Sequence, residues 1–166
     1  ANVLQSEAWN APVMNKVPAG EQPTSVCALP LYHIFAFTVN MMLGMRTGGK
    51  VILIPNPRDL PAVLKELSQH TFHSCPAVNT LFNGLANPPD FPTVNWKNLK
   101  VSVGGGMAVQ SAVAKLWLEK TGCPICEGYG LSETSPSASC NPTTSTEYSG
   151  TIGVPLPNTW MTCLDD

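Results

Sequence analysis

Apolar runs alternate with amphipathic stretches along this chain of 166 residues, and the alternation predicts strands and helices in turn. Val51–Ile54 is an uninterrupted apolar run, which is typical of a strand buried on both faces of a sheet. After Asp59 the apolar residues instead recur three and four positions apart. This spacing predicts a helix with one apolar face and Asp59 as its N-cap. The apolar positions are Leu60, Val63, Leu64 and Leu67.

The same reasoning assigns the remaining segments. Strands are predicted at 26–31, 72–75 and 100–103, and helices at 34–45, 78–85 and from Val109 to a C-cap at Gly122. The last of these helices has an apolar face made of Val109, Ala112, Val113, Leu116 and Trp117. Loops are predicted at 87–95 and 135–150. Closely spaced Gly and Pro residues exclude a long helix at 150–157, and a strand is predicted to begin at 160–164.

This order of elements predicts an α/β fold with a mainly parallel sheet and helices on both faces. Residues 1–149 form one α/β subdomain, and 150–166 begin a following β-rich subdomain. Gly104–Gly106 and Gly128–Glu133 each follow a predicted strand. Because ligands of such sheets bind at the carboxyl ends of the strands, we expect the two segments to meet at one edge.

Charge and hydropathy exclude several classes of protein. The chain has 9 Lys and Arg against 11 Asp and Glu, a net charge of -2, and no basic cluster, which argues against a nucleic-acid partner. Residues 22–45 contain no Asp, Glu, Lys or Arg, but Pro23, Pro30 and Asn40 interrupt them, so they do not predict a membrane span. No basic region leads into an apolar stretch at Ala1, so no secretory signal is predicted. We expect a cytoplasmic protein.

Five cysteine, histidine and glycine patterns have alternative explanations. The six cysteines, Cys27, Cys75, Cys123, Cys126, Cys140 and Cys163, favour free buried thiols. Cys123 and Cys126 have redox or zinc spacing without a second pair, and His70, His73 and Cys75 lack a fourth ligand. The run 44–50 matches a phosphate loop except that Val51 replaces Ser or Thr. Gly104–Gly106 suggests a dinucleotide fingerprint, but Val109 occupies the position of its third glycine.

The stretch 128–134 contains the groups of a nucleotide and metal site. Tyr129 offers a flat ring for a base, and Gly130 allows a close backbone approach. The Ser132 hydroxyl can bond a phosphate oxygen, and the Glu133 carboxylate can hold Mg²⁺ between phosphates. The alternative is a tight turn after a buried strand, since glycines often flank aromatic residues in turns.

Six segments, in the family's order, resemble the adenylate-forming (AMP-binding) superfamily. They are 29–35, 56–59, 78–83, 104–107, 127–136 and 150–157. The segments 56–59 and 78–83 resemble the bacterial long-chain fatty-acid CoA ligases most. The resemblance implies the large N-terminal domain of an acyl-CoA synthetase/luciferase-like fold. Because the family's phosphate loop, ribose-binding Asp and C-terminal Lys are missing, it also implies a central piece that is inactive alone.

The resemblance implies a ligase that joins a fatty acid to CoA through an acyl-adenylate, using ATP and CoA as co-substrates and Mg²⁺ as cofactor. The implied catalytic residues are His33, Ser132 and Glu133, with Glu133 as the metal ligand. The implied ATP/AMP-binding residues are Gly104, Gly105, Gly106, Glu127, Gly128, Tyr129, Gly130 and Ser132. The implied acyl-binding residues are His33, Val78, Phe82 and Gly104, although Val78 and Phe82 have the spacing of any buried helix.

Two departures from the family pattern leave the functional groups in place. Ser132 replaces the usual Thr, and Ala108 replaces a frequent Pro. A homodimer and a peripheral contact of the parent enzyme with the inner membrane stay open. The alternative functions are a stand-alone, non-catalytic acyl- or nucleotide-binding module and an adenylate-forming enzyme for another carboxylate.

Overall fold

The computed structural model describes residues 1–165, in which seven strands form one mixed sheet. The strands are β1 (Thr24–Cys27), β2 (Lys50–Leu53), β3 (Ser74–Ala77), β4 (Val101–Gly104), β5 (Ile125–Gly130), β6 (Ser137–Cys140) and β7 (Val154–Pro155). Their spatial order is β2-β1-β3-β4-β5-β6-β7. The pairs from β2 to β5 are parallel, and β6 and β7 add antiparallel pairs. The predicted mainly parallel sheet is therefore confirmed.

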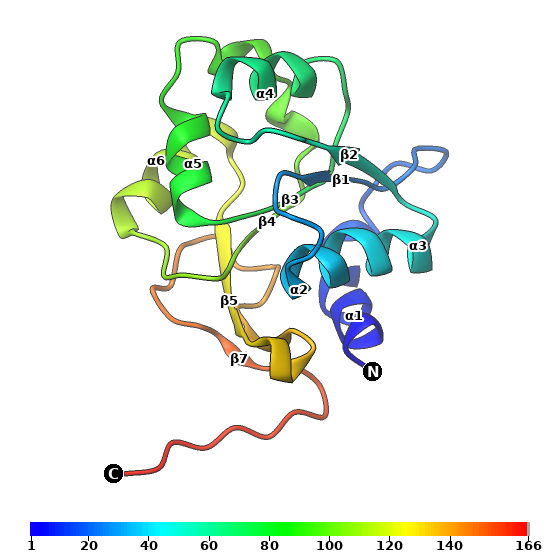
Figure 1. Ribbon diagram of the computed structural model, residues 1–166, viewed down its shortest axis with the longest axis vertical. Coiled ribbons are helices and arrows are strands. Elements are labelled where there is room, and N and C mark those ends of the chain that lie inside the picture. The colour runs from blue at the N-terminus through cyan, green and yellow to red at the C-terminus, as the bar shows by residue number, and fades with distance from the viewer. Residues whose placement is uncertain (166) are drawn as a thin grey trace.

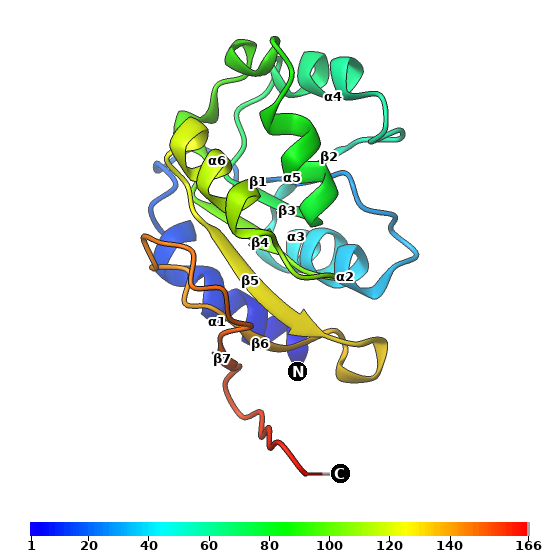
Figure 2. The ribbon, with the colours of Figure 1, turned by 90° about the vertical axis from the view of Figure 1, so that its left-hand side faces the viewer.

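Helices cover both faces of this sheet (Figures 1 and 2). They are α1 (Asn2–Met14), α2 (Ile34–Ala36), α3 (Leu43–Thr47), α4 (Leu60–Leu67), α5 (Asn79–Ala86) and α6 (Ser111–Thr121). A π-helical segment, 37–42, joins α2 to α3, and 3₁₀ turns occur at 91–93, 96–98 and 132–134. Figure 1 shows α4, α5 and α6 on one side of the sheet and α1, α2 and α3 on the other. Among residues 1–165, no helix is long and apolar enough to cross a bilayer.

The face beneath α4, α5 and α6 is filled by aromatic side chains. Phe82 and Trp117 are 0% exposed, and their ring centroids lie 4.9 Å apart in an edge-to-face arrangement. Trp96 stacks on Phe91 at 4.8 Å and meets the edge of Trp117 at 5.1 Å. The Trp117 indole N–H donates to the Ser102 hydroxyl of β4 at 2.9 Å. This cluster anchors α5 and α6 on the sheet, because edge-to-face and offset aromatic pairs add to the gain from burial.

The opposite face is less filled. Ser74, Pro76, Val101 and Val103, which alternate with the core positions of β3 and β4, line a pocket on this side. The π-helical segment places Asn40 against β1, where its amide donates to the Ser25 hydroxyl at 2.8 Å and to the Val26 carbonyl at 2.9 Å. Such π segments widen one turn of a helix and often occur at functional sites.

Several local predictions are confirmed by side-chain geometry. Asp59 caps α4 by accepting from the Ala62 N–H at 3.2 Å, and Gly122 ends α6 with φ of 70°. His73, 1% exposed, accepts from the Thr24 N–H at 3.1 Å and bonds Glu21 at 3.2 Å, so it is a structural histidine. Five of the six cysteines are free and buried, but Cys163 is exposed.

Four predictions of local structure are wrong. The run 51–54 lies at the sheet edge, where β2 pairs with β1 alone and Leu53 is 57% exposed. Residues 137–140 form β6 although their small polar side chains suggested a loop. Trp160 is 98% exposed, and 160–164 form no strand. Ala112 on α6 is exposed, and Ala114 takes its place in the core.

The N-terminal helix α1 was not predicted at all. Its apolar residues lack a clear stripe, and Pro12 lies inside it. Polar side chains hold it in place: Asn2 exchanges two hydrogen bonds with the Ser137 backbone, and the Trp9 indole donates to the Asn141 carbonyl at 3.1 Å. β7 pairs with β6, so the sheet continues past the boundary expected at residue 150, and that boundary stays a prediction. The second expected subdomain ends at Asp166, which lies outside the described residues.

Candidate functional site

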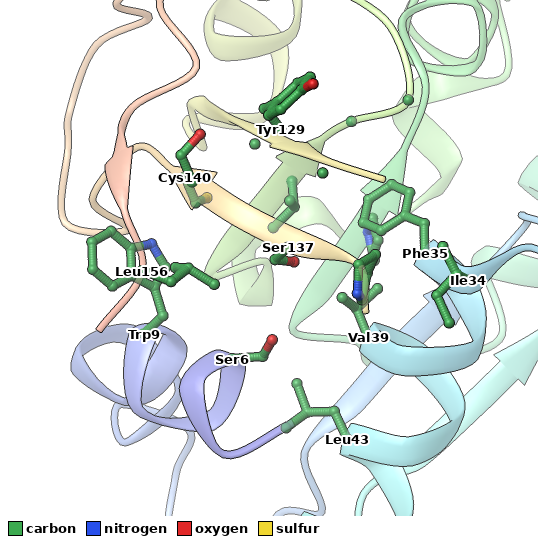
Figure 3. A pocket seen from close by; sticks show the side chains of 18 of the residues that line it. Ser6, Trp9, Ile34, Phe35, Val39, Leu43, Tyr129, Ser137, Cys140 and Leu156 are labelled. Atoms are coloured by element: carbon green, nitrogen blue, oxygen red, sulfur yellow. The ribbon is translucent and has the colours of Figure 1, made fainter. Parts of the chain in front are cut away.

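A pocket of about 400 Å³ lies between the sheet and the helices α1, α2 and α3 (Figure 3). The two segments that were expected to meet at one sheet edge, Gly104–Gly106 and Gly128–Glu133, both line this pocket. His33 lines it too. Of the residues proposed from the sequence, its lining contains His33, Gly104, Gly105, Gly106, Gly128, Tyr129, Gly130, Ser132 and Glu133. The topology accounts for this meeting, because β4 and β5 are parallel neighbours whose carboxyl ends lie together.

Strand β5 carries Tyr129 to the pocket wall. Tyr129 is 41% exposed and pairs with Ser139 of β6, and Figure 3 shows its ring at the pocket. A flat, accessible ring of this kind can stack on a planar base. Gly130 follows at an irregular point of the β5–β6 pairing, where a Cβ atom would lie only 1.9 Å from the Pro136 carbonyl oxygen. The close approach for which this glycine is needed is therefore to its own chain.

Ser132 and Glu133 lie on a single 3₁₀ turn, 132–134, that immediately follows β5. The Thr134 hydroxyl accepts from the Leu131 N–H at 2.8 Å and so closes the turn. Both Ser132 and Glu133 are exposed and line the pocket, and within residues 1–165 Glu133 makes no ion pair. The turn therefore presents one hydroxyl and one uncompensated carboxylate at the pocket.

The described residues contain no group of three or more His, Cys, Asp or Glu side chains that could hold a metal ion. Glu133 alone nevertheless fits Mg²⁺, which keeps several waters and commonly binds through one or two carboxylates together with substrate phosphates. The chemistry of this single hard oxygen donor is therefore compatible with a metal brought in by a nucleotide.

The glycine loop, defined here as Gly104–Gly106, leaves the end of β4 and forms another wall of the pocket. Gly106 has φ of 79°, a backbone conformation that residues with a Cβ atom rarely adopt. Glu127 behaves differently from the role expected for it. It is buried, does not line the pocket, and accepts a hydrogen bond from the Val109 N–H at 2.8 Å. Glu127 thus holds Val109, three residues after the glycine loop, and does not line the pocket.

His33 is the N-cap of α2. Its Nδ1 accepts from the Phe35 N–H at 3.2 Å, which in the neutral ring places the proton on Nε2. The side chain is exposed and lines the pocket, so Nε2–H is the group available to donate to a bound anion. The capping role and a role at the pocket are therefore compatible in one residue.

A second pocket of about 570 Å³ shares His33, Phe35 and Gly106 with the first. Val78, at the N-cap of α5, lines this second pocket. Phe82, the other acyl-binding residue expected on the same helix, lines neither pocket. It is 0% exposed because it packs against Trp117 in the core. The structure therefore places Val78 near His33 and Phe82 away from it.

Sequence reasoning missed three groups of pocket residues. They are Ser6, Trp9, Asn10 and Met14 of α1; Phe35, Val39 and Leu43 on the helix after His33; and Ser137, Ser139 and Cys140 of β6. The i, i+4 spacing from Phe35 to Leu43 could have indicated a pocket-facing stripe. Burial raises the pKa of the Cys140 thiol to about 11, so this group stays neutral at physiological pH.

Comparison with known proteins places the chain in a family. The model of the AMP-binding enzyme family matches residues 1–166. The long-chain-fatty-acid–CoA ligase of Yersinia pestis is 46% identical over 166 residues, which are all of this chain and 29% of that protein. The enzyme of the same name from Haemophilus influenzae is 49% identical over 143 residues, 86% of this chain and 25% of its own length. The chain thus spans under a third of these relatives.

Solved structures share the fold at low sequence identity. ATP-bound MatB from Rhodopseudomonas palustris superposes with a TM-score of 0.75 at 22% identity, covering 94% of this chain and 30% of its own. The anthranilate CoA ligase AuaEII in complex with anthranoyl-AMP gives a TM-score of 0.75 at 20% identity, covering 93% of this chain and 29% of its own. With the family match over its whole length and relatives 46% and 49% identical, the chain belongs to the AMP-binding enzyme family.

Proposed function

We propose that the chain is part of an ATP-dependent long-chain fatty-acid CoA ligase. The protein first joins a fatty carboxylate to the α-phosphate of ATP, which gives acyl-adenylate and pyrophosphate. The CoA thiol then displaces AMP to form the thioester. The observation that carries the proposal is one pocket that combines His33, the glycine loop and the Tyr129–Glu133 segment in a chain 46% identical to a ligase of that name.

The nucleotide half of the pocket is assigned from its chemistry. Tyr129 stacks on adenine, while Gly104, Gly105, Gly106, Gly128 and Gly130 supply backbone around the nucleotide. The Ser132 hydroxyl donates to a phosphate oxygen, and the exposed Glu133 carboxylate is the residue that would hold Mg²⁺. Bound Mg²⁺ would neutralise the charge that develops on the transferred phosphoryl group.

The acyl half lies beside it. His33 donates from Nε2–H to the oxygens around the reacting carboxylate, so it orients the nucleophile and stabilises charge without forming a covalent bond. Val78 and Gly104 flank the acyl group from α5 and β4. The apolar side chains Phe35, Val39 and Leu43 suit a hydrocarbon chain, because burying each methylene contributes about 0.8 kcal/mol.

The test uses the full-length protein with saturated fatty acids of increasing length. We expect pyrophosphate exchange that depends on ATP, Mg²⁺ and fatty acid, followed by acyl-CoA formation when CoA is added. Exchange only with short or aromatic carboxylates would refute the long-chain assignment and keep the family chemistry. Nucleotide binding without any exchange would favour the non-catalytic module. A cytoplasmic location with peripheral membrane contact and a homodimer complete the proposal and rest on the resemblance alone.

A further inference from the structure

Both backbone groups of Val109 are held by side chains from other parts of the chain. Its N–H donates to Glu127 Oε1 at 2.8 Å, and its carbonyl accepts from the Tyr148 hydroxyl at 2.5 Å. Val109 is 4% exposed, so water does not compete freely for these bonds. A buried backbone group without a partner would cost free energy, so each of these contacts favours the observed loop conformation.

Val109 lies three residues beyond the glycine loop, in a stretch that has no regular structure. Residues 105–110 belong to neither β4 nor α6. Gly105 N–H donates to Ala77 at the start of this stretch, and Gln110 N–H donates to Asn79 Oδ1 at 2.9 Å at its end. Between these two points, the two hydrogen bonds of Val109 attach the stretch 105–110 to the rest of the chain. Glu127 and Tyr148 thus hold the stretch that follows Gly106.

Tyr148 comes from the segment 141–151, which is itself attached to β5. Asn141 N–H donates to the Glu127 carbonyl at 2.9 Å, and Asn141 Oδ1 accepts from the Ser149 hydroxyl at 2.8 Å. Tyr148 also packs partly buried against the core. Burial and then the negative charge of Glu127 raise the pKa of Tyr148, so its hydroxyl stays protonated and remains a donor. The segment that carries Tyr148 is thus itself held in place by hydrogen bonds, and so is the hydroxyl that contacts Val109.

We propose that Tyr148 is a positioning residue for nucleotide binding: together with Glu127 it holds Val109 and thereby fixes the glycine loop at the pocket. The inference rests on the proposed function for the identity of the ligand, ATP. It assigns a role to a segment whose sequence, rich in Ser and Thr, indicated only a connecting loop. Tyr148 acts through the loop backbone and lines neither pocket.

The experiment compares the full-length protein with its Tyr148→Phe variant, which keeps the ring and removes the hydroxyl. The loss of one buried hydrogen bond predicts an increase of about five-fold in the dissociation constant and KM of ATP. We expect kcat for pyrophosphate exchange to change much less, since the residue contacts no reacting atom. Hydrogen–deuterium exchange at residues 105–110 should become faster.

Thr121→Val is the matched control. The part-buried Thr121 hydroxyl donates to the Trp117 carbonyl at 2.7 Å, and neither residue lines a pocket, so we expect wild-type ATP affinity in this variant. A lower unfolding temperature in Tyr148→Phe with unchanged ATP affinity and unchanged exchange at 105–110 would overturn the proposal. So would equal losses of ATP affinity in both variants. A wild-type protein without ligase activity would instead refute the proposed function, while ATP titration and hydrogen exchange still test the role of Tyr148.

Discussion

On the sheet face covered by α4, α5 and α6, aromatic rings fill the space above β3 and β4, whereas on the face covered by α1, α2 and α3 a pocket of about 400 Å³ lies above the same two strands. The difference arises within single strands. On β3, Cys75 and Ala77 belong to the core while Ser74 and Pro76 line the pocket. Alternate residues of a strand face opposite sides, so one short segment serves both purposes.

The two faces are also held together by different forces. The packed face relies on apolar burial, with Trp117 at its centre. Its two buried indole N–H groups, of Trp117 and Trp96, donate to the Ser102 hydroxyl and the Phe91 carbonyl. The pocket face relies on polar contacts between distant segments, such as Asn2 with Ser137 and Asn40 with Val26. Side-chain hydrogen bonds can fix helices around an empty space, which close-packed apolar residues cannot do without filling it.

The largest difference between the faces should appear in stability. We expect Phe82→Ala in the full-length protein to lower the free energy of unfolding by about 3–5 kcal/mol, because it leaves a cavity beside Trp117. Phe35→Ala, on the pocket face and only half-buried, should cost less than about 2 kcal/mol. Urea unfolding of both variants measures the difference, and equal losses would contradict the contrast between a filled and a hollow face.

The same pair of variants separates packing from substrate selection. Phe35→Ala should change the preference for fatty-acid chain length, since Phe35 lines the pocket. Phe82→Leu, which keeps most of the core volume, should leave that preference unchanged. A changed preference in Phe82→Leu alone would restore the acyl-binding role that the sequence suggested for this residue.

Ligase activity, in contrast to stability, should be more sensitive to changes on the pocket face. Glu133→Ala is expected to lower fatty-acid-dependent pyrophosphate exchange by about 100-fold, because it removes the carboxylate proposed to hold Mg²⁺. Its unfolding temperature should stay within experimental error of wild type, since Glu133 is exposed. Glu119→Ala, an exposed carboxylate on α6, is the control and should retain full exchange. Unchanged exchange in Glu133→Ala would refute the metal assignment.

The packed face was the easier one to predict from the sequence. Periodic apolar residues placed α4, and Asp59 and Gly122 marked helix ends, because these signals are local. The parallel sheet followed from the alternation of elements. The edge position of β2 could not follow, since an apolar run such as 51–54 does not report how many neighbouring strands it has.

The pocket face was harder because its signals are non-local. His33, Tyr129 and Glu133 could be named from short motifs, and the structure brings them to one pocket. Trp9 and Tyr148 could not, because their partners Asn141 and Val109 lie 132 and 39 residues away. The motif that contains Glu127 did not predict the partner of its carboxylate, which accepts a hydrogen bond from the Val109 N–H.

Glu127, a buried residue of β5, offers a test of how the stretch after the glycine loop is held. Glu127→Ala removes the acceptor for the Val109 N–H and should raise the KM of ATP about ten-fold, whereas Glu127→Gln keeps a carbonyl acceptor and should raise it about three-fold. Steady-state pyrophosphate exchange with varied ATP measures both. If the two variants were equally impaired, the negative charge of Glu127 would matter more than its hydrogen bond to the loop.

The smallest expected effect concerns the buried thiols and pH. Burial raises the pKa of Cys75, on the packed face, to about 12, while the unfolded thiol titrates near 9. Above pH 9 the unfolded chain loses a proton that the folded chain keeps, so stability should fall as pH rises, by about 1 kcal/mol for this group at pH 10. Cys75→Ala should therefore show a smaller difference in unfolding free energy between pH 8 and pH 10 than wild type. Cys163→Ala, which removes an exposed thiol, is the control and should keep the wild-type difference. An unchanged difference in Cys75→Ala would mean that the thiol is accessible to water, and hence that the packed face opens more readily than its filled interior indicates.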